Sequence, residues 1–183
     1  MPASPPARSV WSVADIEVLP RDGQRFEVLH GELLVTPSPA FRHQRAAIEL
    51  AVLFRTASGE GYPVSVSAPG VIQISNTTQL EPDLVVYAIA PTARPVWQEL
   101  PPPLLAVEFG SPSTQATDRH RKRPAYLAAG IPEVWTIDLE ARLIERWTSA
   151  SEFPTVERAD FDFALSAAHA ALRVSMQAIF GDA

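Results

Sequence analysis

The run LLAVEF at Leu104–Phe109 is apolar except for Glu108, which sits where a buried strand would normally carry no charge. A similar run, EPDLVVY at Glu81–Tyr87, carries Asp83, and EVWTID at Glu133–Asp138 follows as a third strand-like run. Acidic side chains are almost never fully buried unless they are paired or bound to a metal. The three runs therefore predict strands, two of which carry a candidate functional carboxylate.

Outward from these strands, the pattern alternates between helices and strands and indicates one mixed sheet with helices packed against it. In the first half of the chain we expect a short helix from Ser12 to about Leu19, a hairpin over 25–35 around Gly31, a helix from about Arg42 to Ser58, and strands at 64–67 and 71–74. In the second half we expect a helix from about Asp118 to Ala129 ended by Gly130, a second hairpin at 133–148 and a final short helix at 170–180.

The composition fits one domain of 183 residues, 46% of them hydrophobic, over residues 11–183 with a disordered lead at 1–10. There is no cysteine, which excludes disulfides, thiol nucleophiles, zinc fingers and iron–sulfur clusters and fits a cytoplasmic location. No apolar run approaches the roughly 18 residues of a membrane helix. The net charge of -6 argues mildly against a nucleic-acid coat protein but does not exclude a nuclease.

Period-two alternation places Glu108 on the same strand face as Ala106, and Asp83 on the same face as Val85. If the two strands are neighbours, these carboxylates can converge and repel each other, and a divalent cation would remove the repulsion. Hard oxygen ligands favour Mg²⁺ or Mn²⁺. Such a metal could polarise a phosphodiester and activate water, and a nearby ammonium could orient or deprotonate that water.

Each of these residues also has an ordinary structural interpretation. Asp83 after Pro82 could be only a turn cap at the start of a strand. Glu108 could form a structural salt bridge to Arg119 or Lys122. The basic run from Arg119 to Arg123 could be a solvated helix face.

Several ordered motifs between about Val13 and Trp147 resemble the Uma-two family of restriction-endonuclease-like proteins, formerly described as a domain of unknown function. They are Phe26–Leu33, Arg42–Gln44, Pro82–Leu84, Val107–Thr114, Asp118–Tyr126 and Ala129–Asp138. The family belongs to the PD-(D/E)XK nuclease superfamily. The resemblance implies an α/β restriction-endonuclease-like fold: a central mixed β-sheet flanked by helices, with an N-terminal hairpin.

The resemblance also implies roles for individual residues. Asp83 and Glu108 would bind the metal, together with the carbonyl of Phe109. In the commonest form of the superfamily motif a lysine follows the glutamate by two residues, but here that position is Gly110. In the resembling family the lysine has moved to the next helix, and Lys122 occupies that place.

Further residues could assist. Glu27 would be an additional catalytic carboxylate, or an ordinary strand glutamate. His43 at the start of the long helix could contact phosphate or carry a proton, or could simply begin the helix. The remaining accessory candidates are Asp118 and Tyr126, which would share a helix face with Lys122, and the basic residue Arg119.

Pro124 lies between Lys122 and Tyr126, inside the segment that the resemblance implies is helical. A proline inside a helix costs on the order of 3 kcal/mol. We therefore expect either a kinked helix or one that begins near Arg123. In the second case Lys122 would lie on a loop, and Arg119 or Arg121 could supply the positive charge instead.

We expect a Mg²⁺- or Mn²⁺-dependent endonuclease that cleaves phosphodiester bonds of nucleic acid, with DNA as the expected substrate. A homodimer would suit cleavage of a duplex. One alternative is a catalytically inactive nuclease fold that binds DNA or protein. Another is a structural ion-pair cluster without any ligand.

Overall fold

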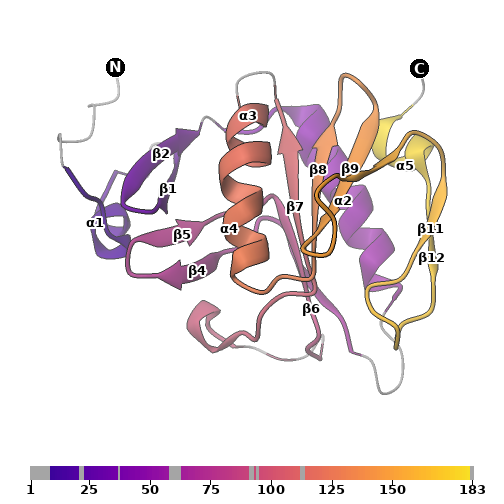
Figure 1. The fold of residues 1–183 in the computed structure, drawn as a ribbon, viewed down its shortest axis with the longest axis horizontal. Helices are drawn as coiled ribbons and strands as arrows, with labels where there is room; N and C mark the ends of the chain where they lie inside the picture. Colours follow the sequence, from indigo (N-terminus) through magenta and orange to yellow (C-terminus); the bar gives the residue numbers. More distant parts are fainter. Residues whose placement is uncertain are drawn as a thin grey trace. The chain divides into compact units, whose positions relative to one another are not determined.

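The structure is a computed structural model, and it describes residues 9–20, 23–36, 38–57, 63–90, 93, 95–111 and 114–181 (Figure 1). The chain divides into two compact units, one of Met1–Pro39 with Val71–Glu81 and one of Ala40–Gly70 with Pro82–Ala183. The expected lead at 1–10 falls almost wholly outside the described residues, and the expectation of a single domain stays a prediction. No helix in the described residues is both long enough and apolar enough to cross a membrane.

The smaller unit contains a four-stranded sheet and one short helix. The helix α1 (Val13–Glu17) begins with a capping box, in which Ser12 Oγ accepts from the Asp15 N–H and the Asp15 carboxylate accepts from the Ser12 N–H. The predicted hairpin is confirmed: β1 (Arg25–Leu29) pairs antiparallel with β2 (Glu32–Thr36). His30 and Gly31 form its turn with φ values of 53° and 82°, as the tightest hairpin turns require. The sheet order is β2-β1-β5-β4, with β4 at Ile72–Ser75 and β5 at Thr78–Leu80.

The larger unit contains a six-stranded sheet of order β10-β9-β8-β7-β6-β3. Its strands are β3 (Ser65–Ser67), β6 (Leu84–Tyr87), β7 (Leu105–Gly110), β8 (Glu133–Asp138), β9 (Leu143–Thr148) and β10 (Thr155–Glu157). The pair β7–β8 is parallel and the other pairs are antiparallel. The predicted mixed sheet is therefore confirmed, and the runs that carry Asp83, Glu108 and Glu133–Asp138 are neighbours in it.

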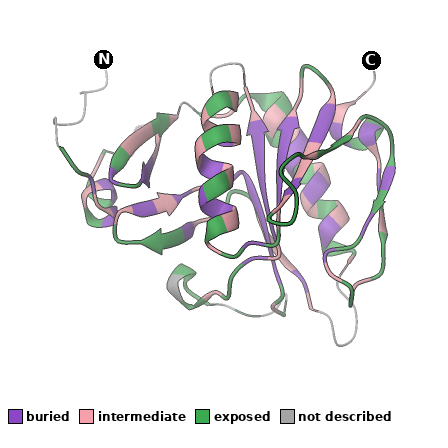
Figure 2. Ribbon diagram, in the orientation of Figure 1, coloured by how far each residue is buried: buried purple, intermediate pink, exposed green. Residues whose placement is uncertain are grey.

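Helices cover both faces of this sheet (Figure 1). On one face, α2 (Phe41–Arg55) buries Leu50 and Phe54 in a core that also contains Val107, Phe109 and Trp135. The other face of β7 carries Ala106 and Glu108, and a helical segment from Gln115 to Ala128 packs over it. That segment consists of α3 (Gln115–Thr117), a π-helical turn η2 (Asp118–Lys122) and α4 (Arg123–Ala128). Figure 2 shows β7 and β8 as buried strands.

The expected strands near 64–67 and 71–74 are confirmed as β3 and β4, and they belong to different sheets, since β3 pairs with β6 and β4 pairs with β5. One expectation for an individual element was wrong. The expected final helix over 170–180 is only α5 (Met176–Phe180), because β12 (Leu172–Val174) first pairs with β11 (Phe161–Phe163). Ser175 Oγ accepts from the Ala178 N–H and so caps the helix start six residues later than expected. A short 3₁₀ turn, η1 (Trp97–Glu99), lies in the loop between β6 and β7.

Candidate active site

Asp83 lies immediately before β6, one step beyond the last register pair of β6 with β7, Leu84 opposite Val107. Its Oδ2 accepts from the Phe109 N–H at 2.9 Å, so the buried side chain continues the ladder where backbone pairing ends. This contact ties Asp83 to the strand of Glu108. Glu108 directly precedes Phe109 on β7, so this hydrogen bond brings the Asp83 side chain to the part of β7 that carries Glu108.

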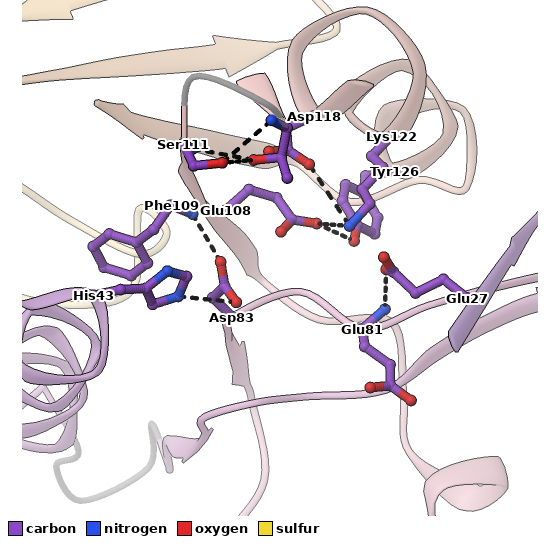
Figure 3. A network of polar contacts seen from close by, with 11 residues as sticks. Glu27, His43, Glu81, Asp83, Glu108, Phe109, Ser111, Asp118, Lys122 and Tyr126 are labelled. Carbon is purple, nitrogen blue, oxygen red and sulfur yellow. Dashed lines mark hydrogen bonds and ion pairs between the residues drawn. The ribbon is translucent and has the colours of Figure 1, made fainter. Parts of the chain in front are cut away.

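His43 reaches Asp83 from the first turn of α2. Its Nε2 lies 3.1 Å from Asp83 Oδ1, and its ring lies 5.1 Å from the ring of Phe109 (Figure 3). The helix α2 packs on the core through Ala46, Ala47 and Leu50, which fixes the direction of the His43 side chain. The structure thus brings one of the accessory candidates to the strand carboxylates.

Glu108 is 3% exposed and points away from the apolar core toward the helical segment that covers the sheet. Its Oε1 accepts from the Tyr126 hydroxyl at 2.7 Å and lies 3.4 Å from Lys122 Nζ. The Lys122 ammonium also lies 3.6 Å from Asp118 Oδ1. The predicted common face of Asp118, Lys122 and Tyr126 is confirmed by these contacts (Figure 3).

The α-helix that contains Pro124 begins at Arg123, as one of the two expectations had it, but Lys122 does not lie on a loop. Residues Asp118–Lys122 form a π-helical turn, and the Arg123 N–H donates to the Asp118 carbonyl. Pro124 then falls at the start of α4, where a missing N–H and a fixed φ are tolerated. Because the wider turn absorbs the proline, Lys122 stays on the helix and its ammonium reaches Glu108. Single π turns of this kind are frequent at functional sites.

Gly110 is the position at which the resemblance described above implies a lysine in the commonest motif. A Cβ built on Gly110 would lie 3.3 Å from the Gln115 Cγ at the start of α3. Gln115 in turn donates from Nε2 to Asp138 Oδ2 at 2.7 Å, and Asp138 is the residue of β8 in register with Gly110. Burial raises the pKa of Asp138, but this hydrogen bond and the backbone N–H groups of Glu140 and Ala141 outweigh it and lower the pKa. A side chain at 110 would therefore require the Gln115 side chain to shift by a few tenths of an ångström.

A row of polar side chains that was not predicted from the sequence crosses the sheet beneath the helical segment. Glu108 is in register with Thr136 on β8, and Thr136 is in register with Glu145 on β9. Arg119 binds both carboxylate oxygens of Glu145 at 2.8 Å, and Thr136 donates to the same carboxylate at 2.8 Å. Arg119, proposed above as a partner of Glu108, thus contacts a carboxylate two strands away.

Arg123 of the same helical segment lies over the Trp147 ring. The Cζ atom of its guanidinium is 3.9 Å from the ring centre. Burial lowers the pKa of Arg123, partly opposed by the nearby Glu145 carboxylate. Trp147 donates from Nε1 to Thr136 Oγ1 at 3.2 Å. Thr136, Glu145 and Trp147 alternate along their strands with period two, which is the signal that could have placed them on one face.

Glu27 belongs to the smaller unit and is buried on β1. Its Oε1 accepts from the Glu81 N–H at 2.7 Å (Figure 3). It therefore anchors the chain two residues before Asp83. Its expected catalytic role stays a prediction.

The residues present suit a hard divalent cation. Among the described residues of the larger unit, the fully buried charged side chains are three carboxylates, Asp83, Glu108 and Asp118, and one ammonium, Lys122. This excess of buried negative charge is the electrostatic condition that a cation relieves. Carboxylate oxygens are the donors that Mg²⁺ and Mn²⁺ prefer. No cluster of three or more His, Cys, Asp and Glu side chains with metal-binding potential occurs in the described part of the chain, so a cation here would rely on two side chains and backbone or water oxygens.

Changing Tyr126 to Phe tests how firmly Glu108 is held. The Tyr126 hydroxyl is buried and donates to a carboxylate at 2.7 Å, and hydrogen bonds to charged groups contribute about 1.5–3 kcal/mol. We expect the free energy of unfolding in urea to fall by about 2 kcal/mol. Tyr87→Phe is the matched control, because Tyr87 is also a buried tyrosine of this unit, its pKa raised by burial to about 12. An equal decrease in the free energy of unfolding in both variants would show that the hydrogen bond to Glu108 contributes no more than the hydroxyl of another buried tyrosine.

Comparison with known proteins agrees with this fold. The family model Uma2, described as a putative restriction endonuclease, matches residues 13–171. A solved crystal structure, described as a putative nuclease belonging to DUF820 from Anabaena variabilis, superposes with a TM-score of 0.72 at 16% sequence identity. The superposition covers 93% of this chain and 97% of that chain. The search among curated proteins found no match.

Proposed function

Because the chain belongs to the Uma2 family, whose description is putative restriction endonuclease, we propose that it is a divalent-metal-dependent endonuclease that hydrolyses phosphodiester bonds of DNA. One observation carries the proposal: the buried Asp83 carboxylate accepts from the Phe109 N–H, next along β7 from the buried Glu108, and the Lys122 ammonium lies 3.4 Å from Glu108. Two carboxylates and an ammonium are the groups that metal-assisted phosphodiester hydrolysis requires.

Each side chain has a defined part in this proposal. Asp83 and Glu108, with the carbonyl of Phe109, would hold Mg²⁺ or Mn²⁺. The bound metal would polarise the phosphodiester and lower the pKa of a water molecule. Lys122 would orient that water or neutralise charge on the phosphate oxygens. His43, in contact with Asp83 Oδ1 at 3.1 Å, would fix the orientation of that carboxylate.

The proposal extends to a homodimer in the cytoplasm. Cleavage of both strands of a duplex is served by two sites related by twofold symmetry. The absence of cysteine from the chain fits a reducing compartment.

Nicking of supercoiled plasmid DNA in Mg²⁺ or Mn²⁺ is the direct test. We expect nicking by the wild type, none in a metal chelator, and loss of at least about 100-fold in Asp83→Ala, because a missing ligand forfeits several kcal/mol of transition-state stabilisation. Asp162→Asn is the control, since Asp162 forms an exposed ion pair with Arg173 on the β11–β12 pair. Folded wild type that nicks in neither metal would refute the proposal.

A non-catalytic nuclease fold that binds DNA or protein is the second candidate. The observation that favours it is Gly110, which replaces the strand lysine of the common motif. Under this alternative, DNA would bind equally well with and without divalent metal and would remain intact. A filter-binding assay with labelled duplex, run beside the nicking assay, separates the two.

A further inference from the structure

Asp118 is a buried carboxylate for which the proposed mechanism gives no role. It lies at the first residue of the π turn η2, and Lys122 lies at its last. Asp118 Oδ1 is 3.6 Å from Lys122 Nζ, and both side chains are 5% exposed. A buried carboxylate is retained at a cost unless it balances a charge, and the Lys122 ammonium is a charge within reach of Asp118.

The Lys122 ammonium lies between two carboxylates at nearly equal distances, 3.4 Å from Glu108 Oε1 and 3.6 Å from Asp118 Oδ1. Glu108 is also the carboxylate assigned to the cation. If Lys122 had Glu108 as its only carboxylate, the ammonium and the cation would compete for the same group. A second carboxylate within reach lets the ammonium remain in place while Glu108 turns to the cation.

We propose that Asp118 is a positioning residue: it holds the Lys122 ammonium at the site when Glu108 binds a divalent cation. This inference rests on the proposed function, since it presupposes that Glu108 binds the cation. The backbone supports it, because the Arg123 N–H donates to the Asp118 carbonyl and closes the wide turn that carries both charged side chains. The π turn that accommodates Pro124 thus also fixes Asp118 relative to Lys122.

The test is a double-mutant cycle read out by Mn²⁺ binding, measured by calorimetry without DNA. The four proteins are the wild type, Asp118→Asn, Lys122→Met and the double variant. We expect Asp118→Asn to weaken Mn²⁺ binding about tenfold, as coupled charged neighbours do, because Lys122 then pairs with Glu108 alone. The double variant should bind Mn²⁺ as tightly as Lys122→Met, because no ammonium is left to position.

Two further variants separate positioning from other effects. Asp118→Glu keeps the charge and should restore binding to within about threefold of the wild type. It also keeps the test decisive if Asp118→Asn does not fold, because a Glu variant that folds but binds about tenfold more weakly would contradict the proposal. Asp162→Asn removes an exposed acidic group of the same unit and should leave Mn²⁺ binding unchanged.

An equal loss of affinity from Asp118→Asn with and without Lys122 would overturn the inference, because Asp118 would then act on the cation directly, as a ligand or through its field. Binding by the wild type and by Asp118→Asn with the same affinity would also overturn it. Folded wild type that binds no Mn²⁺ would overturn the proposed function and this inference with it. The first two results would leave the proposed function standing.

Discussion

Glu108→Gln should reduce metal-dependent nicking by at least about 100-fold, while the protein still folds. The amide oxygen of glutamine can still accept from the Tyr126 hydroxyl, which lies 2.7 Å from Glu108 Oε1 in the wild type. The substitution therefore removes the charge and keeps the shape and the main hydrogen bond. Lys122 retains Asp118 at 3.6 Å as a partner. Activity should then depend on the lost charge rather than on a rearranged helix.

Thermal unfolding with and without Mn²⁺ separates this prediction from a structural salt bridge. A ligand that binds only the native state stabilises it, by about 2.7 kcal/mol at 100 times its Kd. We expect Mn²⁺ to raise the melting temperature of the wild type and to leave that of Glu108→Gln unchanged. A purely structural Glu108–Lys122 pair predicts a less stable variant and no response to metal in either protein.

Glu145→Gln is the matched control for Glu108→Gln. Glu145 lies in the same polar row of the sheet, two strands from Glu108, and binds Arg119 through both carboxylate oxygens. Its loss should destabilise the fold and leave nicking intact. If both variants lost activity in proportion to their loss of stability, Glu108 would have no separate part in the chemistry.

The strands and the carboxylate pair could be predicted from the sequence because they depend on short-range alternation. Period two along β7 assigned Glu108 to the face opposite Phe109, and Phe109 indeed packs in the core against which α2 lies. Pro82 and Asp83 marked the start of β6. The sequence left open whether this strand lies beside β7, and the structure shows that it does.

The partners of the basic residues could not be predicted, since they depend on strand order and on helix geometry. Arg119 meets Glu145 only because β9 lies beside β8 and the helix crosses both strands. The effect of Pro124 depended on a π turn, which no local propensity signals. The contact of His43 with Asp83 likewise required the packing of α2 on the sheet. Each of these contacts joins elements far apart in the sequence.

Lys122→Met is expected to uncouple metal binding from cleavage. Nicking should fall by about 10²–10⁴-fold, the range contributed by a positioned proton donor or acceptor. Mn²⁺ should nevertheless bind more tightly than to the wild type, because the ammonium 3.4 Å from Glu108 is a competing cation. Methionine has a similar length and fills the buried space without a charge.

The protein without metal should become less stable at the same time. Removing one partner of a buried ion pair typically costs about 3–5 kcal/mol, because the remaining charge is left uncompensated. Lys122→Met leaves the buried carboxylates of Glu108 and Asp118 without the ammonium that lies between them. Saturating Mn²⁺ should recover part of this loss, since the cation supplies the missing positive charge.

Arg119→Met provides the comparison for Lys122→Met on the same helix. Arg119 pairs with Glu145, away from Glu108, so its loss should lower stability and change Mn²⁺ affinity far less than Lys122→Met does. Calorimetry on the three proteins and urea unfolding with and without Mn²⁺ measure both effects. A Lys122→Met protein that binds Mn²⁺ more weakly than the wild type would mean that the ammonium helps to assemble the metal site instead of competing for it.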